Sequence, residues 1–183
     1  MSRLLVERAQ AGDRDAYEQL ARAAARPLFL VASRILRDTD AAEDAVQAAL
    51  IAMWRDLPAL RDSDRFDAWA YRLVVRQCQN HGRRERRLGV RVVDLMEAAP
   101  GGRDQLADVA LRDELGRAFD SLSRDHRTVV VLHHLVGLPI AEIASILDIP
   151  YGTVGSRLHH AMRAMRAAIE AGDRAAHPEG QPA

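Results

Sequence analysis

The segment from Tyr151 to Arg163 carries side chains that can bind a polyanion. Between residues 149 and 169 the sequence has three Arg and two His but no acidic residue, so this stretch is positive in a chain whose formal charge is zero. Guanidinium and hydroxyl groups bind phosphates and base edges, and free N–H groups at a helix N-terminus attract phosphate. We therefore expect a DNA-binding face made by Tyr151, Gly152, Thr153, Ser156, Arg157, His160 and Arg163.

A helix-turn-helix is predicted to position this face. In such a motif two helices pack across each other at a small residue, and a sharp turn joins them. Ala144 is the small residue, Asp148 tolerates the left-handed turn conformation, and Pro150 can start the second helix. The apolar stripe of that second helix is predicted to be Val154, Leu158, Met162, Met165 and Ile169. The alternative is a three-helix bundle whose polar face only meets solvent.

A second group of polar side chains lies at the start of an apolar helix. Asp40 followed by Glu43 resembles a capping box, and the predicted helix ends at Pro58. Acids near a helix N-terminus are explained by the helix dipole, and this explanation covers Glu43 but not Gln47. Asp44 and Gln47 are three residues apart and share a face. We expect that face to contact another protein.

Aromatic and basic side chains alternate after the loop at residues 58–64. Bases stack on aromatic rings while guanidinium groups follow the phosphates, so this pattern suits unpaired DNA. For Phe66 and Trp69 the favoured interpretation is packing in the core, whereas Arg72 and Arg76 keep an electrostatic role. The loop residues that remain free to shape a pocket for a flipped-out base are Leu60, Arg61, Asp62, Ser63 and Asp64.

The whole chain is predicted to be all-α, with two small helical domains joined by a flexible linker. Helical periodicity runs through most of the sequence, without a convincing alternating strand. Asp13 is expected to cap a helix to about Ala25, and Pro27 to start the next helix. Periodicity fails after Leu88, and residues 98–102 are strong helix breakers. The predicted boundaries are a first domain at 1–87, a linker at 88–107, a second domain at 108–170 and a flexible tail at 171–183.

Composition excludes several classes of protein. Zero net charge argues against strong unaided DNA binding, which depends on neutralising phosphates. The lone Cys78, with no apolar membrane-spanning run and no signal peptide, indicates a cytoplasmic protein with no membrane insertion. Cys78 and His81 lack a second pair of ligands, so we expect no metal site. We find no catalytic residues, phosphate loop or cofactor motif, and expect no enzyme.

These motifs together resemble the extracytoplasmic-function (ECF) sigma factors of bacterial RNA polymerase, over roughly residues 4–168. The similarity lies in the order and spacing of motifs across two domains. The first domain is matched by Ala11-Gly-Asp13, Arg34-Ile-Leu-Arg-Asp38, Ala42-Glu-Asp-Ala-Val-Gln47, Trp54-Arg-Asp-Leu57, Phe66-Asp-Ala-Trp69 and Tyr71-Arg72. The second domain is matched by Leu122-Ser-Arg-Asp-His-Arg127, Gly137-Leu138, Glu142-Ile-Ala144, Ile149-Pro150, Gly152-Thr-Val154 and Ser156-Arg-Leu158.

The resemblance implies a dissociable polymerase subunit that recognises promoters and helps to open them. It implies contact with the clamp helices of the largest polymerase subunit through Glu43, Asp44, Gln47, Leu50 and Met53. It implies recognition of single-stranded DNA near position −10 by Leu60, Arg61, Asp62, Ser63, Trp69, Arg72, Arg76 and Asn80. The helix-turn-helix residues given above would read duplex DNA near position −35. The implied further partners are the flap of the second-largest polymerase subunit and an anti-sigma protein.

A free-standing helix-turn-helix regulator is the alternative function. It would bind duplex DNA alone, which zero net charge and the Asp44 and Gln47 face disfavour. Gly155 and His160 stand where the sigma family commonly has Lys and Arg. We therefore expect the second domain to bind DNA well only when the first is docked on polymerase.

Overall fold

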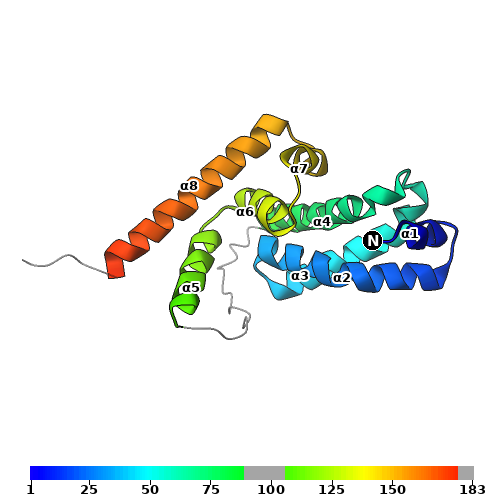
Figure 1. The fold of residues 1–183 in the computed structure, drawn as a ribbon, viewed down its shortest axis with the longest axis horizontal. Coiled ribbons are helices and arrows are strands. Elements are labelled where there is room, and N and C mark those ends of the chain that lie inside the picture. The colour runs from blue at the N-terminus through cyan, green and yellow to red at the C-terminus, as the bar shows by residue number, and fades with distance from the viewer. Residues whose placement is uncertain (89–105, 177–183) are drawn as a thin grey trace, which may run out of the picture.

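The protein is represented by a computed structural model that describes residues 1–88 and 106–176, with side chains for residues 1–84 and 113–172. Helices form the regular structure of these residues and no strand occurs in them, which confirms the predicted all-α class. The predicted linker therefore lies mostly outside the described residues, as do residues 177–183. Two groups of helices, one on each side of this linker in the sequence, build the fold (Figure 1).

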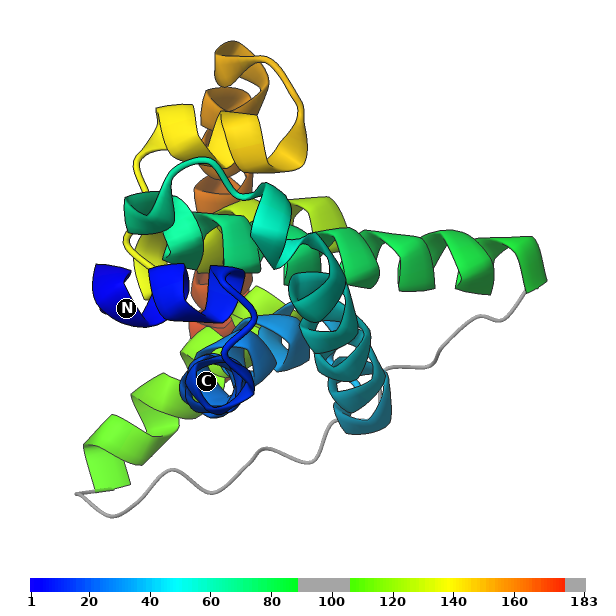
Figure 2. The same ribbon diagram turned by 90° about the vertical axis from the view of Figure 1, so that its right-hand side faces the viewer.

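The N-terminal group is a bundle in which the long helix α2 contacts α1, α3 and α4. Short 3₁₀ turns join α3 to α4, where the sequence predicted a loop. The last turns of α4 project from the bundle (Figure 2). The elements are α1 (Arg3–Gln10), α2 (Arg14–Leu36), α3 (Thr39–Asp56), η1 (Leu57–Ala59), η2 (Ser63–Arg65) and α4 (Phe66–Leu88).

The C-terminal group is built around the long helix α8, which contacts α5, α6 and α7. Ser123 caps α6, because its hydroxyl accepts a hydrogen bond from the backbone N–H of His126 at 3.3 Å. The elements are α5 (Leu106–Asp120), α6 (Arg124–Val130), the π-helical turn η3 (Val131–Leu135), α7 (Ile140–Leu147) and α8 (Tyr151–Ala176).

The prediction of two helices on either side of Pro27 is wrong, because α2 runs unbroken from Arg14 to Leu36. A proline within a helix removes a hydrogen bond and crowds the carbonyl four residues earlier. Buried side chains before and after it, including Ala24, Leu28 and Val31, hold both halves of α2 against its neighbours. Tertiary packing therefore outweighs the local cost of the proline.

The predicted capping box at Asp40 is also wrong, because Asp38 is the N-cap of α3. The Asp38 carboxylate accepts a hydrogen bond from the backbone N–H of Ala41 at 2.9 Å, while Asp40 lies inside the first helical turn. Arg37 ends α2 in the left-handed conformation with φ of 58°, so the chain has already turned when it reaches Asp38. The new helix begins at this first available capping residue.

Two expectations for the last helix need correction. Helix α8 continues to Ala176, so the predicted tail from residue 171 begins too early. Met162, predicted to lie in the buried stripe, has 46% of its surface exposed, while the neighbouring Ala161 is fully buried. Val154 and Leu158 are buried as predicted, and Met165 packs partly buried against the core.

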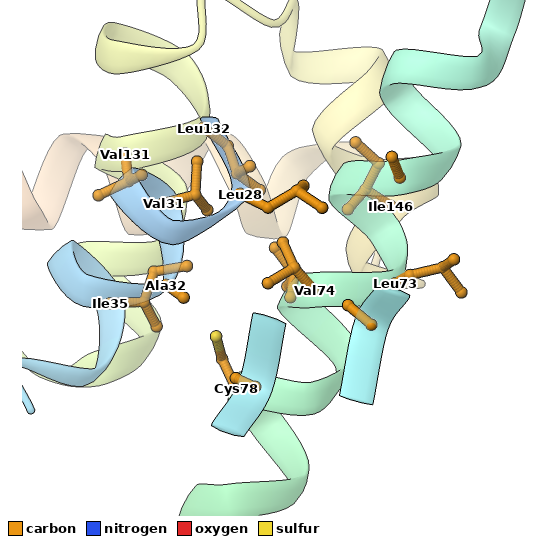
Figure 3. Packing of buried hydrophobic residues seen from close by; sticks show 14 of the residues in the cluster. Leu28, Val31, Ala32, Ile35, Leu73, Val74, Cys78, Val131, Leu132 and Ile146 are labelled. Atoms are coloured by element: carbon orange, nitrogen blue, oxygen red, sulfur yellow. The ribbon is translucent and has the colours of Figure 1, made fainter. Parts of the chain in front are cut away.

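One continuous apolar core joins the two groups of helices. Leu28, Val31 and Ile35 of α2 belong to the same cluster as Leu132 of η3 and Ile146 of α7. Figure 3 shows these side chains close together, from ribbons of both groups. Helices α6 and η3 contact α2, and α7 contacts α4. The two domains of the sequence prediction are therefore packed together in this structure.

Two arginines complete this interface, and we call them the arginine caps. The Arg127 side chain is 5% exposed, and its Nε donates a hydrogen bond to the Ile35 carbonyl, near the end of α2, at 3.2 Å. Arg37, just after α2, donates from Nη1 to the Asp120 carbonyl at the end of α5, at 2.9 Å. Its Nε also lies 3.0 Å from the Asp120 carboxylate. Each domain thus supplies a cation to a helix C-terminus of the other, where carbonyls lack intrahelical partners and the dipole is negative.

The corrected N-cap leads to a test of stability. We expect Asp38→Ala to lower the free energy of unfolding by about 1 kcal/mol, because it leaves the Ala41 N–H without its acceptor. Asp40→Ala is the matched control, since it removes an exposed acid from the same helical turn and only its smaller interaction with the dipole. Urea denaturation of both variants measures the two losses. A larger loss in Asp40→Ala would contradict the assignment of Asp38 as the cap.

Candidate nucleic-acid and polymerase interfaces

The helix-turn-helix is formed by α7, the turn at Asp148 and α8. Asp148 adopts φ of 54° and ψ of 49°, the left-handed conformation predicted for it. Ala144 is 9% exposed at the crossing, and its carbonyl accepts the backbone N–H of Ile149 at 3.2 Å. Helix α8 begins directly after Pro150. The small residue, turn and proline therefore perform the local roles that the sequence predicted.

The outer face of α8 displays most of the side chains predicted to bind duplex DNA. Tyr151, Gly152, Ser156, His160 and Arg163 are exposed, and Thr153 is half-buried. The Ser156 hydroxyl donates a hydrogen bond to the Thr153 carbonyl at 3.0 Å, so in this structure it is turned back onto the helix. The face has the exposure and the positive charge that a groove-reading helix needs.

Arg157 differs from the other predicted residues of this face because it has an acidic partner. Its Nη2 lies 2.8 Å from the carboxylate of Asp125, in the first turn of α6. The Arg157 side chain is 29% exposed and lies at the flank of α8 that faces α6. Asp125 was not among the predicted site residues, since it lies 32 positions before Arg157 and no local pattern links the two.

The loop between α3 and α4 is held in shape by a residue that was not among the predicted site residues. Gln10, at the end of α1, donates from Nε2 to the carbonyls of Leu57 and Leu60 at 3.2 and 2.6 Å. The Ser63 hydroxyl donates to the Gln10 side-chain oxygen at 3.2 Å. Arg61 and Asp62 are left exposed, while Leu60 and Ser63 are half-buried. The predicted −10 loop is thus anchored at its base and open at its tip.

The side chains of α4 that were predicted to bind single-stranded DNA do not share one environment. Trp69 is half-buried, with its ring 5.9 Å from that of the fully buried Phe66, so the core interpretation holds for Phe66 and partly for Trp69. Arg76 and Asn80 are exposed. Arg72 instead binds α7, donating from Nη2 to the Ser145 carbonyl at 2.8 Å and to its hydroxyl at 2.7 Å.

The face predicted to contact a protein surrounds a shallow apolar depression of about 450 Å³ between α2 and α3. Glu43 and Gln47 line the depression, and Asp44 is exposed beside them. Phe29 and Leu50 supply apolar surface. An apolar depression with polar groups at its rim fits the surface of a protein interface better than that of an enzyme site. Phe29 was not among the predicted site residues.

Further along α3, the structure removes one predicted residue from this surface and adds two others. Met53 was predicted to contact polymerase, but it is fully buried and belongs to the core, so that prediction is wrong for direct contact. Ile51 and Trp54 are 62% and 46% exposed. Tyr17 holds this part of α3, because its hydroxyl donates to the Leu50 carbonyl at 2.6 Å and its ring meets Trp54 edge-on. Burial raises the pKa of the Tyr17 phenol, which keeps it a donor.

Cys78 lies in the core on α4, near Ile35 and Val74 (Figure 3). Burial raises the pKa of its thiol to about 12. A thiol that stays protonated is a poor nucleophile, so Cys78 is suited to packing in the core and not to redox chemistry. The described side chains hold no group of three or more His, Cys, Asp or Glu that could bind a metal. Within residues 1–88 and 106–176, no helix is both long and apolar enough to cross a bilayer.

Both halves of the chain match described protein families. Residues 20–88 match the family model for sigma-70 region 2, and residues 112–165 match the model for sigma-70 region 4. The sequence is 32% identical over 174 residues to the ECF RNA polymerase sigma-E factor of Escherichia coli strain K12, covering 88% of this chain and 91% of that protein. The chain belongs to the ECF sigma factors. It is a promoter-recognition subunit of RNA polymerase, as the resemblance implied, and this family initiates transcription without being an enzyme.

Other relatives agree with this assignment. This sigma factor is 31% identical over 180 residues to the RNA polymerase sigma-H factor of Pseudomonas aeruginosa, covering 91% of this chain and 92% of that protein. Its fold matches that of CnrH, solved with the cytosolic domain of CnrY, with a TM-score of 0.64, 27% identity and coverage of 92% and 97%. It also matches the sigma factor RpoE of Bartonella quintana, solved with the anti-sigma factor NepR, with a TM-score of 0.67, 21% identity and coverage of 84% and 96%.

The state of Cys78 can be tested by thiol chemistry. We expect the native protein to react very slowly with a chromogenic disulfide reagent at pH 8, because the thiol is buried and its pKa is raised to about 12. The same protein in guanidinium chloride should react fully within the mixing time. The unfolded thiol ionises near pH 9, so Cys78 should also make the fold less stable as pH rises from about 9 to 12. Rapid native reaction at pH 8 would contradict this placement.

Proposed function

We propose that this sigma factor divides its task between three surfaces on the two domains. The depression and polar residues of α2 and α3 bind core polymerase. The loop after α3 and the first half of α4 bind the non-template strand near position −10. Helix α8 binds duplex DNA near position −35. The observation that carries this proposal is the presence, on one chain, of an acid-free exposed helix-turn-helix face and a separate exposed apolar surface with polar groups at its rim.

The α3 surface suits a partner helix with apolar and basic residues. Ile51 and Trp54 supply exposed apolar area, and aromatic side chains are favoured at the centres of interfaces. Glu43, Asp44 and Gln47 add two negative charges and an amide at the N-terminal end of the same helix. These features support docking on the clamp helices of the largest polymerase subunit, and the flap of the second-largest subunit remains the proposed partner of the C-terminal domain.

The −10 surface suits an unpaired strand because it combines an anchored loop with exposed cations. Gln10 fixes the base of the loop, so Arg61 and Asp62 are presented at its tip without first being ordered. Arg76 is exposed one turn beyond Arg72 on α4. Guanidinium groups along a helix can follow phosphates while a base occupies the loop.

We further propose that an anti-sigma protein regulates this chain in the cytoplasm. Two structural relatives were solved with such a regulator or with a partner's cytosolic domain. The same exposed apolar surface that would bind polymerase is available to a competing protein. An anti-sigma protein that covers Ile51 and Trp54 would prevent docking on the core enzyme.

The decisive experiment is run-off transcription with core polymerase and genomic promoter fragments. We expect specific transcripts only when both this protein and core polymerase are present. Footprinting of duplex DNA by the protein alone, with no stimulation of core polymerase, would instead support a free-standing regulator.

The docking surface is tested by single substitutions on α3. We expect Asp44→Ala and Gln47→Ala each to weaken binding to core polymerase about five-fold, because each removes an exposed polar contact at the rim of an interface. Binding to an isolated −35 duplex should not change. Asp113→Ala, an exposed acid on α5, is the matched control. If both α3 variants bind core polymerase with normal affinity, the assignment of this face as the docking surface is wrong.

The proposed recognition of −35 DNA by α8 is tested at Arg157. We expect Arg157→Ala to weaken −35 recognition by about 1–3 kcal/mol if the guanidinium reaches the DNA beyond its Asp125 contact. Arg117→Ala, an exposed arginine of α5, controls for the loss of one positive charge. Promoter occupancy measured at two salt concentrations separates a base contact from a phosphate contact. Unaltered occupancy would show that Arg157 serves only to join α8 to α6.

A further inference from the structure

The Gln10 side chain joins the two sides of the loop between α3 and α4. Helix α1, which ends at Gln10, contacts both of the short turns in this loop, η1 and η2 (Figure 1). On the η1 side, Gln10 Nε2 donates to the Leu60 carbonyl at 2.6 Å, and on the η2 side Gln10 Oε1 accepts from the Ser63 hydroxyl at 3.2 Å. The exposed tip residues Arg61 and Asp62 lie between these two anchors. One amide group therefore ties together both ends of the tip.

The orientation of the Gln10 amide is fixed by its neighbours. A carbonyl oxygen can only accept hydrogen bonds, so the NH₂ end of the amide must face the Leu57 and Leu60 carbonyls. The amide oxygen then faces the Ser63 hydroxyl. A carboxylate of the same shape has no N–H group to donate, and a methionine has no strong donor or acceptor. The set of three bonds is therefore specific to an amide at this position.

The backbone that carries this amide is held by the packing of α1 on α2. Val6 and Ala9 of α1 are buried in the core. The chain turns towards α2 at Gly12, whose φ of 92° is a conformation that favours glycine. The Asp13 carboxylate then caps α2 by accepting the backbone N–H of Ala16 at 3.0 Å. The end of α1 is thus a fixed point from which a side chain can hold the loop.

Each of the two short turns also has local hydrogen bonds, which stay within that turn. In η1 the Leu60 N–H donates to the Leu57 carbonyl at 3.0 Å. In η2 the Arg65 N–H donates to the Asp62 carbonyl at 3.1 Å, and the Asp64 N–H donates to the Asp62 carboxylate at 3.0 Å. These bonds shape each turn by itself. The separation of the two turns is set by the amide that bridges them.

We propose that Gln10 is a positioning residue for base selection at the −10 element, a role that rests on the function proposed above for this loop. By fixing the separation of Leu60 and Ser63, the amide determines which base fits at the tip. Selective contacts must be held within about 0.5 Å of their productive geometry. Loss of the bridge therefore lowers the base preference of the loop, while the docking surface on α3 keeps its structure.

The test replaces the amide without shortening the side chain. Gln10→Met keeps the length, and Gln10→Glu keeps the shape but turns carboxylate oxygens towards two carbonyls. Each full chain is assembled with core polymerase, and run-off rates are compared on an active promoter that carries each of the four bases at each −10 position. Both variants should lose about ten-fold of the wild-type preference at one or two adjacent positions, which is the discrimination of a single base contact. Preferences at the other positions and binding to core polymerase should stay within two-fold.

Two controls match these variants. Gln19→Met makes the same change at an exposed glutamine of α2. Arg3→Met removes a second polar contact from α1 to the loop, an exposed ion pair with Asp64 at 3.6 Å, and such pairs contribute little. Both controls should keep the wild-type preferences.

Three results would each overturn the positioning role of Gln10. They are an equal fall in rate on all promoters, an unchanged base preference in either Gln10 variant, and a loss of binding to core polymerase. A wild-type holoenzyme without base preference at −10 would instead overturn the function proposed for the loop. Failure of the wild type in run-off transcription would overturn the proposed function as a whole.

Discussion

The arrangement of this sigma factor depends on the reciprocal capping of two helix ends by arginines from opposite domains. A helix C-terminus leaves carbonyls without partners and concentrates negative charge. Arg127 meets this need for α2, and Arg37 meets it for α5. Each domain therefore supplies part of the hydrogen bonding at a helix end of the other. The caps place α6 on α2, and the connection from α6 through η3 then brings α7 against α4.

Arginine is suited to both tasks that this chain assigns to it. The chain has 26 arginines and no lysine. Its planar group donates five hydrogen bonds and keeps its charge, so it can serve carbonyls within the protein or phosphates outside it. Arg72 has access to both kinds of acceptor because it lies on the proposed DNA-binding side of α4, within reach of Ser145. The same chemistry thus links domain packing to nucleic-acid binding.

The features that the sequence predicted well are those set by neighbouring residues. Ala144, Asp148 and Pro150 each satisfy a constraint within a few positions, so local residue types are enough to locate the helix-turn-helix. Pro27 could not be placed correctly, because burial on both sides of it depends on other helices. The choice between Met162 and Ala161 depends on how α8 packs against its neighbouring helices. The contacts of Gln10 and Asp125 join residues far apart in the chain, and no periodic pattern encodes such pairs.

The continuous core also determines how the molecule can be dissected. Leu28 and Val31 on one domain, and Leu132 and Ile146 on the other, are covered partly through this shared cluster. A fragment cut between the domains would present these side chains to water, where exposed apolar patches promote self-association. Isolated halves are therefore poor substitutes for the intact chain in binding studies. Soluble fragments would require polar substitutions of these apolar residues, and those substitutions would themselves alter the surface under study.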